Sequence, residues 1–398
     1  MTTTINNEHK KLNVPNLRFP EFQGEWEKCT LEDVMNFSST RVNSSELNED
    51  NYVSTENMLH DYQGIVDAKS VPEDVNVISF SCGDILISNI RPYLKKVWKA
   101  TYNGGCSSDV FVLKANDNIE SDYLHYVIAN DTFINFVMSG AKGVKMPRGD
   151  KNQMKTYSLS LPQIQEQKKI GKMFSLLDER ITTQSKIIED LKKLKCAIIE
   201  NVLNSNHCTT LQLGDVGSYI RGLTYSSNDV VEDNGTLVMR SNNIVNGSPL
   251  DYKGDVVSVN KQISQEQQLQ NGDIVICMAN GSSALVGKSS FYDGECQSPI
   301  TVGAFCGIYR SKMPITKWIF QTNRYRRYIW NSLQGGNGAI ANLNCEDILR
   351  MQFPIPDKQI AERCTKLLSS IDSLIESNVS LYSKFSIQKK YLLRQMFI

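Results

Sequence analysis

Basic and amide side chains gather in a few loops, some of which also contain glycine, and this combination suits contact with nucleic acid. Lysine and arginine pair with phosphate or guanine, asparagine pairs with adenine, and glycine lets a backbone approach a duplex closely. An ordinary solvated loop is the alternative at each place, because a charged loop needs no ligand. The candidate DNA-binding residues are Arg91, Lys95, Lys96, Lys142, Lys145, Arg148, Lys151, Arg221, Lys288, Asn337, Asn342 and Asn344.

The segment 281–289 looks like a phosphate-binding loop, which would indicate an ATP-dependent enzyme. A P-loop has four residues between its first glycine and the Gly-Lys-Ser/Thr, whereas five residues separate Gly281 from Gly287. The corresponding segment in the first half of the chain, 88–97, contains no glycine. We therefore interpret both segments as strand-connecting loops, with basic residues that could face phosphates.

The sequence contains no recognisable catalytic constellation. Its ten cysteines include no C-x-x-C pair, and its four histidines lie far apart without metal-ligand spacing. The tripeptides 67–69 and 251–253 match a D-x-K fragment of nuclease sites, but so short a match recurs by chance. Methyltransferase N-P-P-Y/F, hydrolase G-x-S-x-G and metalloprotease H-E-x-x-H motifs are absent. We expect a protein that is not an enzyme and has no metal or cofactor of its own.

Charge and hydropathy narrow the class of protein further. Lysine and arginine number 43, as do aspartate and glutamate, so the formal net charge is zero. A protein that binds nucleic acid alone usually has a basic excess, so protein partners would supply much of the phosphate contact. No apolar run reaches membrane-spanning length, the N-terminus lacks a signal-peptide pattern, and the cysteines look like free thiols. We expect a cytoplasmic protein with no membrane contact.

The elements that must position the loops occur twice in the chain. An apolar stripe in alternating steps of four and three residues covers 170–202, and adding 194 to each number gives an equivalent stripe over 364–396. The polar interruptions also fall at equivalent places, namely Gln184 and Lys195 in the first stripe, Asn378 and Lys389 in the second. Each stripe predicts a long heptad helix, so the chain is a pseudo-dimer with an internal repeat.

The repeat extends into the segments before the helices. The turn and apolar strand at 82–87 correspond to 271–276, and a short amphipathic helix around 123–138 corresponds to one around 317–333. A proline precedes each long helix and pre-sets φ for its start. The predicted fold is α/β (α+β), with two similar globular segments and two long helices. The expected boundaries are an N-terminal arm at 1–16, globular segments at 17–161 and 207–355, a central helix at 162–206 and a C-terminal helix at 356–398.

The polar seam residues predict how the two helices align. A polar seam residue costs stability but specifies alignment, and an apolar partner would leave it unpaired in the core. An antiparallel register therefore pairs Gln184 with Lys389 and Lys195 with Asn378, around a pseudo-two-fold axis. The apolar seam residues of this coiled coil are Leu177, Ile181, Ile188, Leu191, Ile198, Ile375, Tyr382, Phe385, Leu392 and Met396.

Several motifs resemble those of the specificity (S) subunits of type I restriction–modification systems. The segment 15–22 followed by Trp26 looks like a start common in that family, and Leu213-Gly-Asp-Val-Gly217 is similar at the start of the second copy. The segment 161–170 resembles the family's proline-plus-Glu-Gln entry into its central helix, whereas 357–362 departs from it. The resemblance covers nearly the whole chain, and the two-fold layout is its most specific part.

The resemblance implies a DNA-reading protein rather than an enzyme. Segments 17–161 and 207–355 would be target recognition domains that each read one half of a split, non-palindromic site in double-stranded DNA. Two adenine methyltransferase (M) subunits and up to two restriction (R) subunits would bind the chain, with S-adenosylmethionine, ATP and Mg on those partners. Two alternatives remain, an ATP-dependent enzyme that uses the 281–289 loop and a coiled-coil scaffold that binds only proteins.

Overall fold

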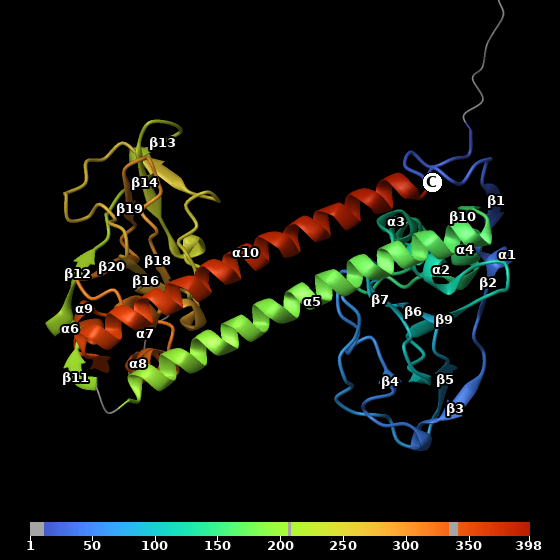
Figure 1. Ribbon diagram of the computed structural model, residues 1–398, viewed down its shortest axis with the longest axis horizontal. Helices are drawn as coiled ribbons and strands as arrows, with labels where there is room; N and C mark the ends of the chain where they lie inside the picture. Colours follow the sequence, from blue (N-terminus) through green and yellow to red (C-terminus); the bar gives the residue numbers. More distant parts are fainter. Residues whose placement is uncertain (1–11, 206–207, 334–340) are drawn as a thin grey trace, which may run out of the picture. The chain divides into compact units, whose positions relative to one another are not determined.

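Two long helices are the largest elements of the fold (Figure 1). The computed structural model describes residues 12–205, 208–333 and 341–398. Within them, α5 spans Ile164–Leu203 and α10 spans Lys358–Met396. Both helices begin two residues after a proline, as the sequence predicted. None of the described helices combines the length and the apolar character needed to cross a bilayer.

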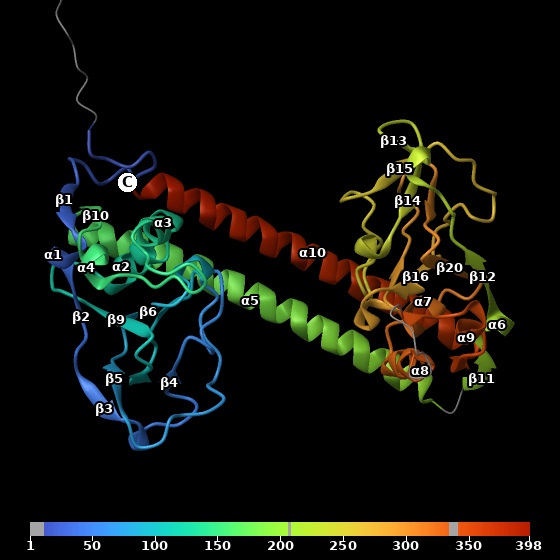
Figure 2. The ribbon, with the colours of Figure 1, turned by 180° about the vertical axis from the view of Figure 1, so that it is seen from behind.

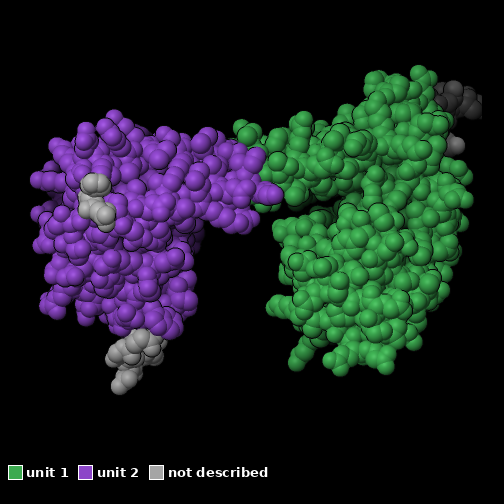
Figure 3. Space-filling view, turned by 60° about the horizontal axis from the view of Figure 1, so that its bottom comes forward, with its two compact units in different colours: residues 1–185, 380–398 green, residues 186–379 purple. Residues whose placement is uncertain are grey.

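The chain divides into two compact units, which Figure 3 shows in different colours. Unit 1 consists of residues 1–185 and 380–398, and unit 2 consists of residues 186–379. Unit 1 contains the start of α5 and the end of α10 in one buried core, whereas unit 2 contains the end of α5 and the start of α10. The two helices are therefore antiparallel within each unit.

The described residues of unit 1 form three sheets. A two-stranded antiparallel sheet pairs its first strand with its last, and Figures 1 and 2 show this pair beside the start of α5. The two four-stranded sheets have the orders β2-β9-β6-β7 and β3-β5-β8-β4. The strands are β1 (Glu27–Thr30), β2 (Met35–Phe37), β3 (Arg41–Asn43), β4 (Tyr52–Val53), β5 (Asn76–Phe80), β6 (Ile85–Ser88), β7 (Val97–Lys99), β8 (Gly104–Cys106), β9 (Val110–Ala115) and β10 (Ser158–Leu161).

Short helices cover the first four-stranded sheet of unit 1. The single helix predicted around 123–138 is in fact two helices, because the Asn130 side chain accepts a hydrogen bond from Thr132 N and caps a new helix there. Gly171 of α5 lies close to this pair, since a Cβ at Gly171 would be 2.6 Å from the Cβ of Asp122. The short helices are α1 (Leu31–Val34), α2 (Ser121–Ile128), α3 (Asp131–Ser139) and α4 (Lys151–Lys155).

Unit 2 has the same kinds of element in the same chain order. Its sheets have the orders β11-β22, β12-β20-β16-β18 and β13-β15-β14-β19, and a further two-stranded pair joins β17 to β21. The strands are β11 (Cys208–Gln212), β12 (Gly217–Arg221), β13 (Val230–Val231), β14 (Thr236–Met239), β15 (Val257–Val259), β16 (Ile274–Cys277), β17 (Ala279–Asn280), β18 (Ser289–Phe291), β19 (Ile300–Val302), β20 (Cys306–Ser311), β21 (Ala341–Asn342) and β22 (Gln352–Pro356). The short helices are α6 (Leu213–Val216), α7 (Thr316–Ile319), α8 (Asn323–Leu333) and α9 (Cys345–Leu349).

The predicted repeat is confirmed, with one difference between the copies. The sheet β2-β9-β6-β7 corresponds strand by strand to β12-β20-β16-β18, and both are antiparallel throughout. In the other sheet, the later strand of the parallel pair (β8) is central in unit 1, whereas the earlier strand (β14) is central in unit 2. The two globular parts therefore share one plan but differ at the sheet away from the long helices.

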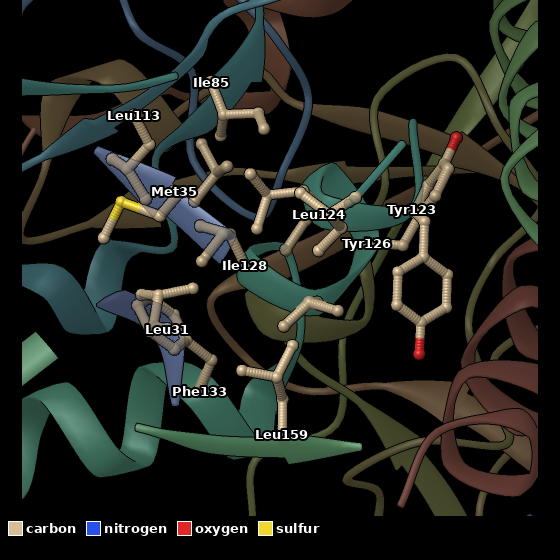
Figure 4. Packing of buried hydrophobic residues seen from close by; sticks show 14 of the residues in the cluster. Leu31, Met35, Ile85, Leu113, Tyr123, Leu124, Tyr126, Ile128, Phe133 and Leu159 are labelled. Atoms are coloured by element: carbon tan, nitrogen blue, oxygen red, sulfur yellow. The ribbon is translucent and has the colours of Figure 1, made fainter. Parts of the chain in front are cut away.

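Each unit has its own main core beside the long helices. In unit 1 this core joins the first four-stranded sheet to α2 and α3, and Figure 4 shows part of it, with Leu31 and Met35 facing Leu124, Ile128 and Phe133. Ile170 and Phe174 of α5 and Met396 of α10 belong to the same core. Burial of these side chains, about 1.5–3 kcal/mol each, fixes the globular part on the helices.

Candidate nucleic-acid interface

Two predicted loops of unit 1 are joined by backbone hydrogen bonds. Arg91 N donates to Pro147 O at 2.8 Å, and Gly149 N donates to Asn89 O at 3.0 Å. The second loop is closed at its base, because Lys142 and Arg148 exchange backbone bonds of 3.0 and 2.9 Å. We name residues 89–96 and 141–150 the first loop cluster.

The backbone of the first loop cluster is constrained. Arg91 and Lys95 have φ of 50° and 55° on either side of a short 3-10 turn that begins at Pro92. Left-handed φ at residues other than glycine costs about 1–3 kcal/mol and concentrates at functional sites. This conformation fixes the backbone that carries Arg91 and Lys95, which an unconstrained solvated loop would not require.

The cations of the first loop cluster differ in whether they form an ion pair within the protein. Arg91 and Lys145 are exposed and have no ion-pair partner in the described part of the chain. Lys142 pairs with Asp150 at 2.9 Å and Arg148 with Asp109 at 2.7 Å, yet both remain exposed. These four side chains form the open positive face of the cluster.

Three other predicted residues of unit 1 are committed to internal contacts. Lys95 pairs with Asp131 at 2.9 Å. Lys96 donates to Thr55 O at 2.6 Å, and burial lowers the pKa of its ammonium group. Lys151 lies over an aromatic ring, with its Nζ 4.7 Å from the ring centroid of Phe111. The structure therefore gives each of these lysines a stabilising contact within the protein.

Unit 2 brings its corresponding loops together in the same way. Strand β17 pairs with β21, which places Ala279 opposite Asn342, and Leu343 N donates to Met278 O at 2.8 Å. Asn342 is exposed, whereas Asn344 caps α9 through a capping box with Asp347. Asn337 lies outside the described residues.

In both units a third loop is hydrogen-bonded to one of the two loops already described. The sequence did not indicate that this loop belongs to the candidate site. In unit 2, Met278 N donates to Phe305 O at 2.8 Å, and in unit 1 the matching bond runs from Asn89 N to Asp109 O at 2.7 Å. Arg221 lies at the adjacent end of β12, opposite Gly307. We name residues 278–285, 303–306 and 341–342, with Arg221, the second loop cluster.

The 281–289 segment does not have the form of a phosphate loop. Gly287 has φ of 79°, and the chain then enters strand β18 at Ser289. A P-loop leads into a helix, whose N-terminal amides bind the phosphates. Lys288 is half-buried beside this strand, and Cys277 N donates to its backbone oxygen at 2.9 Å. The ATP-site alternative therefore lacks its structural basis.

A partly buried aspartate on a long helix connects each globular part to the seam. In unit 1, Asp178 accepts from Lys389 Nζ at 2.6 Å and from the Tyr126 hydroxyl at 2.8 Å. In unit 2, Asp372 accepts from Lys195 Nζ at 2.7 Å, and Lys317 Nζ lies 3.1 Å from its other oxygen. The two aspartates are 194 residues apart, so this anchor is repeated with the fold.

These anchors correct the predicted helix register. Lys389 meets Asp178 rather than Gln184, and Lys195 meets Asp372 rather than Asn378. Each lysine thus meets an acceptor six residues from the predicted one, about 9 Å along a helix, so both predicted polar pairs were wrong. The physical reason is that an aspartate beside the seam offers a charged acceptor, which binds an ammonium group more strongly than an amide does.

The proline-plus-Glu-Gln motif at the start of α5 holds that helix in place. Glu166 is fully buried and receives both the Nε and the NH2 group of Arg18 at 2.8 and 2.7 Å. Gln167 accepts from Glu120 N at 2.8 Å and donates to Pro162 O at 2.9 Å. The second copy has Ile and Ala at the matching positions of α10, so these polar contacts at the helix start occur in unit 1 and are not repeated in unit 2.

His125 is a partly buried histidine of α2. Its Nδ1 atom has no hydrogen-bond partner within the described residues. Burial lowers the pKa of His125 to about 4, and the charge of Lys389 adds to the effect, while Asp178 opposes it. The neutral imidazole is therefore the form that fits this core.

We expect acid to destabilise unit 1 through His125. The unfolded chain protonates this histidine near pH 6.5, whereas the folded chain does so only near pH 4. Below about pH 6.5 the unfolded state thus binds more protons, and the free energy of unfolding should fall by about 2 kcal/mol between pH 7 and pH 5. Denaturant titrations at both pH values should show a smaller decrease for His125→Phe. The exposed His60→Gln variant is the control and should behave as the wild type.

Comparison with known proteins agrees with this architecture. Residues 23–193 match the family model described as the type I restriction modification DNA specificity domain. Over 172 residues the chain is 34% identical to the specificity subunit of the type I restriction enzyme EcoKI of Escherichia coli (strain K12), with 40% of this chain and 35% of that protein covered. Residues 23–193 thus form a type I restriction–modification DNA specificity domain, and the chain is similar to type I specificity subunits.

Other members of the specificity-subunit family match longer parts of the chain. The MjaVIII specificity subunit of Methanocaldococcus jannaschii is 24% identical over 306 residues, covering 69% of this chain and 68% of that protein. The S subunit of a type I system from M. genitalium has the same fold, with a TM-score of 0.65 at 13% identity over 97% of this chain and 99% of that one. The StySPI specificity subunit of Salmonella potsdam is 33% identical over 178 residues, 41% of this chain and 37% of that protein. The matches to EcoKI and StySPI span little more than a third of the length of those proteins.

Proposed function

We propose that this chain is the DNA-reading subunit of a type I restriction–modification assembly. Its first loop cluster would read one half of a split site in double-stranded DNA, and its second loop cluster would read the other half. The observation that carries this proposal is the repeated joining of separate loops by backbone hydrogen bonds, which gathers cations in unit 1 and amide and cationic groups in unit 2.

The two half-sites would differ in sequence. The first loop cluster offers arginine and lysine, which favour guanine and phosphate, whereas the second offers Arg221 and Asn342, which suit guanine and adenine. Equal folds with unequal side chains would give a site without palindromic symmetry.

The chain would recognise DNA without doing chemistry on it. Within the described residues no group of three or more His, Cys, Asp or Glu side chains could hold a metal ion. Adenine methylation and cleavage would belong to two methyltransferase subunits and up to two restriction subunits, which would bring S-adenosylmethionine, ATP and Mg. A zero net charge supports this division of labour, because those partners would also contact the phosphates. We place the assembly in the cytoplasm, where the DNA is.

Mapping of methylated adenines tests the proposal. Cells that carry this chain with its methyltransferase partner should contain adenine methylation at one bipartite, non-palindromic sequence, and cells without the chain should not. A mobility-shift titration of the purified pair, against random DNA, separates DNA reading from a scaffold that binds only proteins. Equal affinity for every duplex would leave the scaffold as the better account.

Loss of an exposed cation in the first loop cluster should weaken one half-site. We expect Lys145→Ala or Arg148→Ala to reduce affinity for the cognate duplex, by about 1–3 kcal/mol if a base contact is lost. A phosphate contact would instead weaken all duplexes similarly and lower the slope of affinity against salt. The control is Lys193→Ala, an exposed cation on α5 that pairs with Glu189 one turn away on the same helix. Unchanged affinity at every salt concentration for both loop variants would make these residues ordinary loop.

A further inference from the structure

Phe305 is an exposed aromatic side chain in the second loop cluster. Its exposed fraction is 69%, the highest of any aromatic side chain in the described part of the chain. A single exposed apolar residue needs no explanation, so its exposure alone assigns no role. Its position among the candidate reading residues is what makes it informative.

The turn that carries Phe305 is held on both sides. Cys306 N donates to Gly303 O at 2.8 Å, and Gly303 N donates to Met239 O at 2.8 Å. The backbone oxygen of Phe305 accepts from Met278 N at 2.8 Å and from Ala279 N at 3.1 Å. The side chain is therefore presented from a fixed backbone rather than from a loose loop.

Two candidate base-reading residues adjoin this turn. Arg221 ends β12 opposite Gly307, two residues beyond Phe305. Asn342 lies opposite Ala279, the residue whose amide bonds to Phe305 O. The backbone of Phe305 thus adjoins the two strands that carry Arg221 and Asn342, whose side chains are suited to base edges in a major groove.

Unit 1 has a charged residue at the matching place. Asp109 accepts the equivalent backbone bond there and forms an ion pair with Arg148. Unit 2 replaces that carboxylate with a phenyl ring, which has no hydrogen-bonding group and would repel neither base nor backbone. The replacement removes a negative charge and adds an apolar contact surface within the second loop cluster.

We propose that Phe305 contacts the C5-methyl group of a thymine in the half-site read by unit 2. The inference rests on the proposed function and adds to it the base that one residue selects. Thymine is the base that presents a methyl group in the major groove, and phenylalanine is among the side chains that pack against it. Insertion between base pairs would require unstacking, which costs a few kcal/mol per step, and a turn bonded to strands on both sides has no projecting arm for it.

Uracil substitution tests this contact directly. Duplexes carrying the mapped site are prepared with each thymine of the second half-site replaced in turn by uracil, which lacks only the methyl group. We expect one replacement to weaken binding of the wild-type complex about fourfold, the effect of losing one buried methyl contact. The Phe305→Ala complex should bind the thymine duplex less tightly and should not distinguish it from the uracil duplex.

Two further variants keep the test specific. Trp330→Ala removes another aromatic side chain of unit 2, with 67% exposed and on α8, and should leave thymine discrimination intact. Phe305→Leu keeps an apolar group and should retain part of the discrimination. Equal binding of all uracil duplexes by the wild type, discrimination retained by Phe305→Ala, or a second half-site without thymine would overturn the inference alone. A complex without any sequence preference would overturn the proposed function, and the inference with it.

Discussion

Replacement of residues 17–160 by the corresponding segment of another specificity subunit should change one half of the methylated sequence and leave the other half unaltered. Every residue of the first loop cluster lies in the exchanged segment, and no residue of the second does. Sequencing of modified adenines in cells that carry the chimera and its methyltransferase partner measures both halves at once. The expected change in specificity is complete at the exchanged half.

The contacts at the segment boundary show how the chimera is best built. The Gln167 side chain bonds to Glu120 N, and Asp178 accepts the hydroxyl of Tyr126, so a donor segment needs a hydroxyl at the Tyr126 position. A second chimera exchanging residues 208–355 is the matched control and should alter the opposite half. A single exchange that changed both halves, or neither, would show that the two units do not read DNA independently.

Asp372→Ala should strongly destabilise unit 2. The Asp372 carboxylate is 12% exposed and is paired with both Lys195 and Lys317. Its removal would leave two largely buried ammonium groups without a partner, and loss of one partner of a buried ion pair costs about 3–5 kcal/mol. The free energy of unfolding from denaturant titration at pH 7 measures this loss.

The matched control is Asp178→Ala in unit 1. Asp178 is 35% exposed and pairs with one lysine, so its removal leaves one ammonium group rather than two without a partner and the loss should be smaller. A triple variant with Asp372, Lys195 and Lys317 all replaced by leucine or methionine should recover much of the stability, because an apolar set can replace a buried ion cluster. Equal losses for Asp372→Ala and Asp178→Ala would contradict this explanation.

The repeat and the long helices were predictable because they depend on local patterns. A stripe in steps of three and four fixes a helix whatever surrounds it, and a proline two residues before each long helix marked its start. The register was not predictable in this way. It depends on Asp178 and Asp372, which lie one residue outside the stripes, and their importance appears only when Lys389 and Lys195 are seen to reach them.

The candidate site was predictable in part. Basic and amide side chains near glycine pointed to the loops containing Lys145 and Asn342. The structure joins each of these loops to another, which the sequence did not predict. The sequence could not predict which candidate side chains make contacts within the protein. Lys151 lies over an aromatic ring, and Asn344 caps a helix. Nothing in the sequence indicated that Phe305 is exposed in the candidate site, because an apolar residue between two strands is ordinarily buried in the core.

The composition of unit 1 has a consequence for synthesis of the chain on the ribosome. Its core takes in Leu392, Leu393, Met396 and Phe397, which are made only after the whole of residues 186–379. At about 5–20 residues per second, that interval lasts roughly 10–40 s. The second unit is continuous in sequence and can fold first. Until the end of α10 is made, the first unit exposes an apolar surface to which chaperones can bind. A premature stop near residue 380 would therefore damage the half made first.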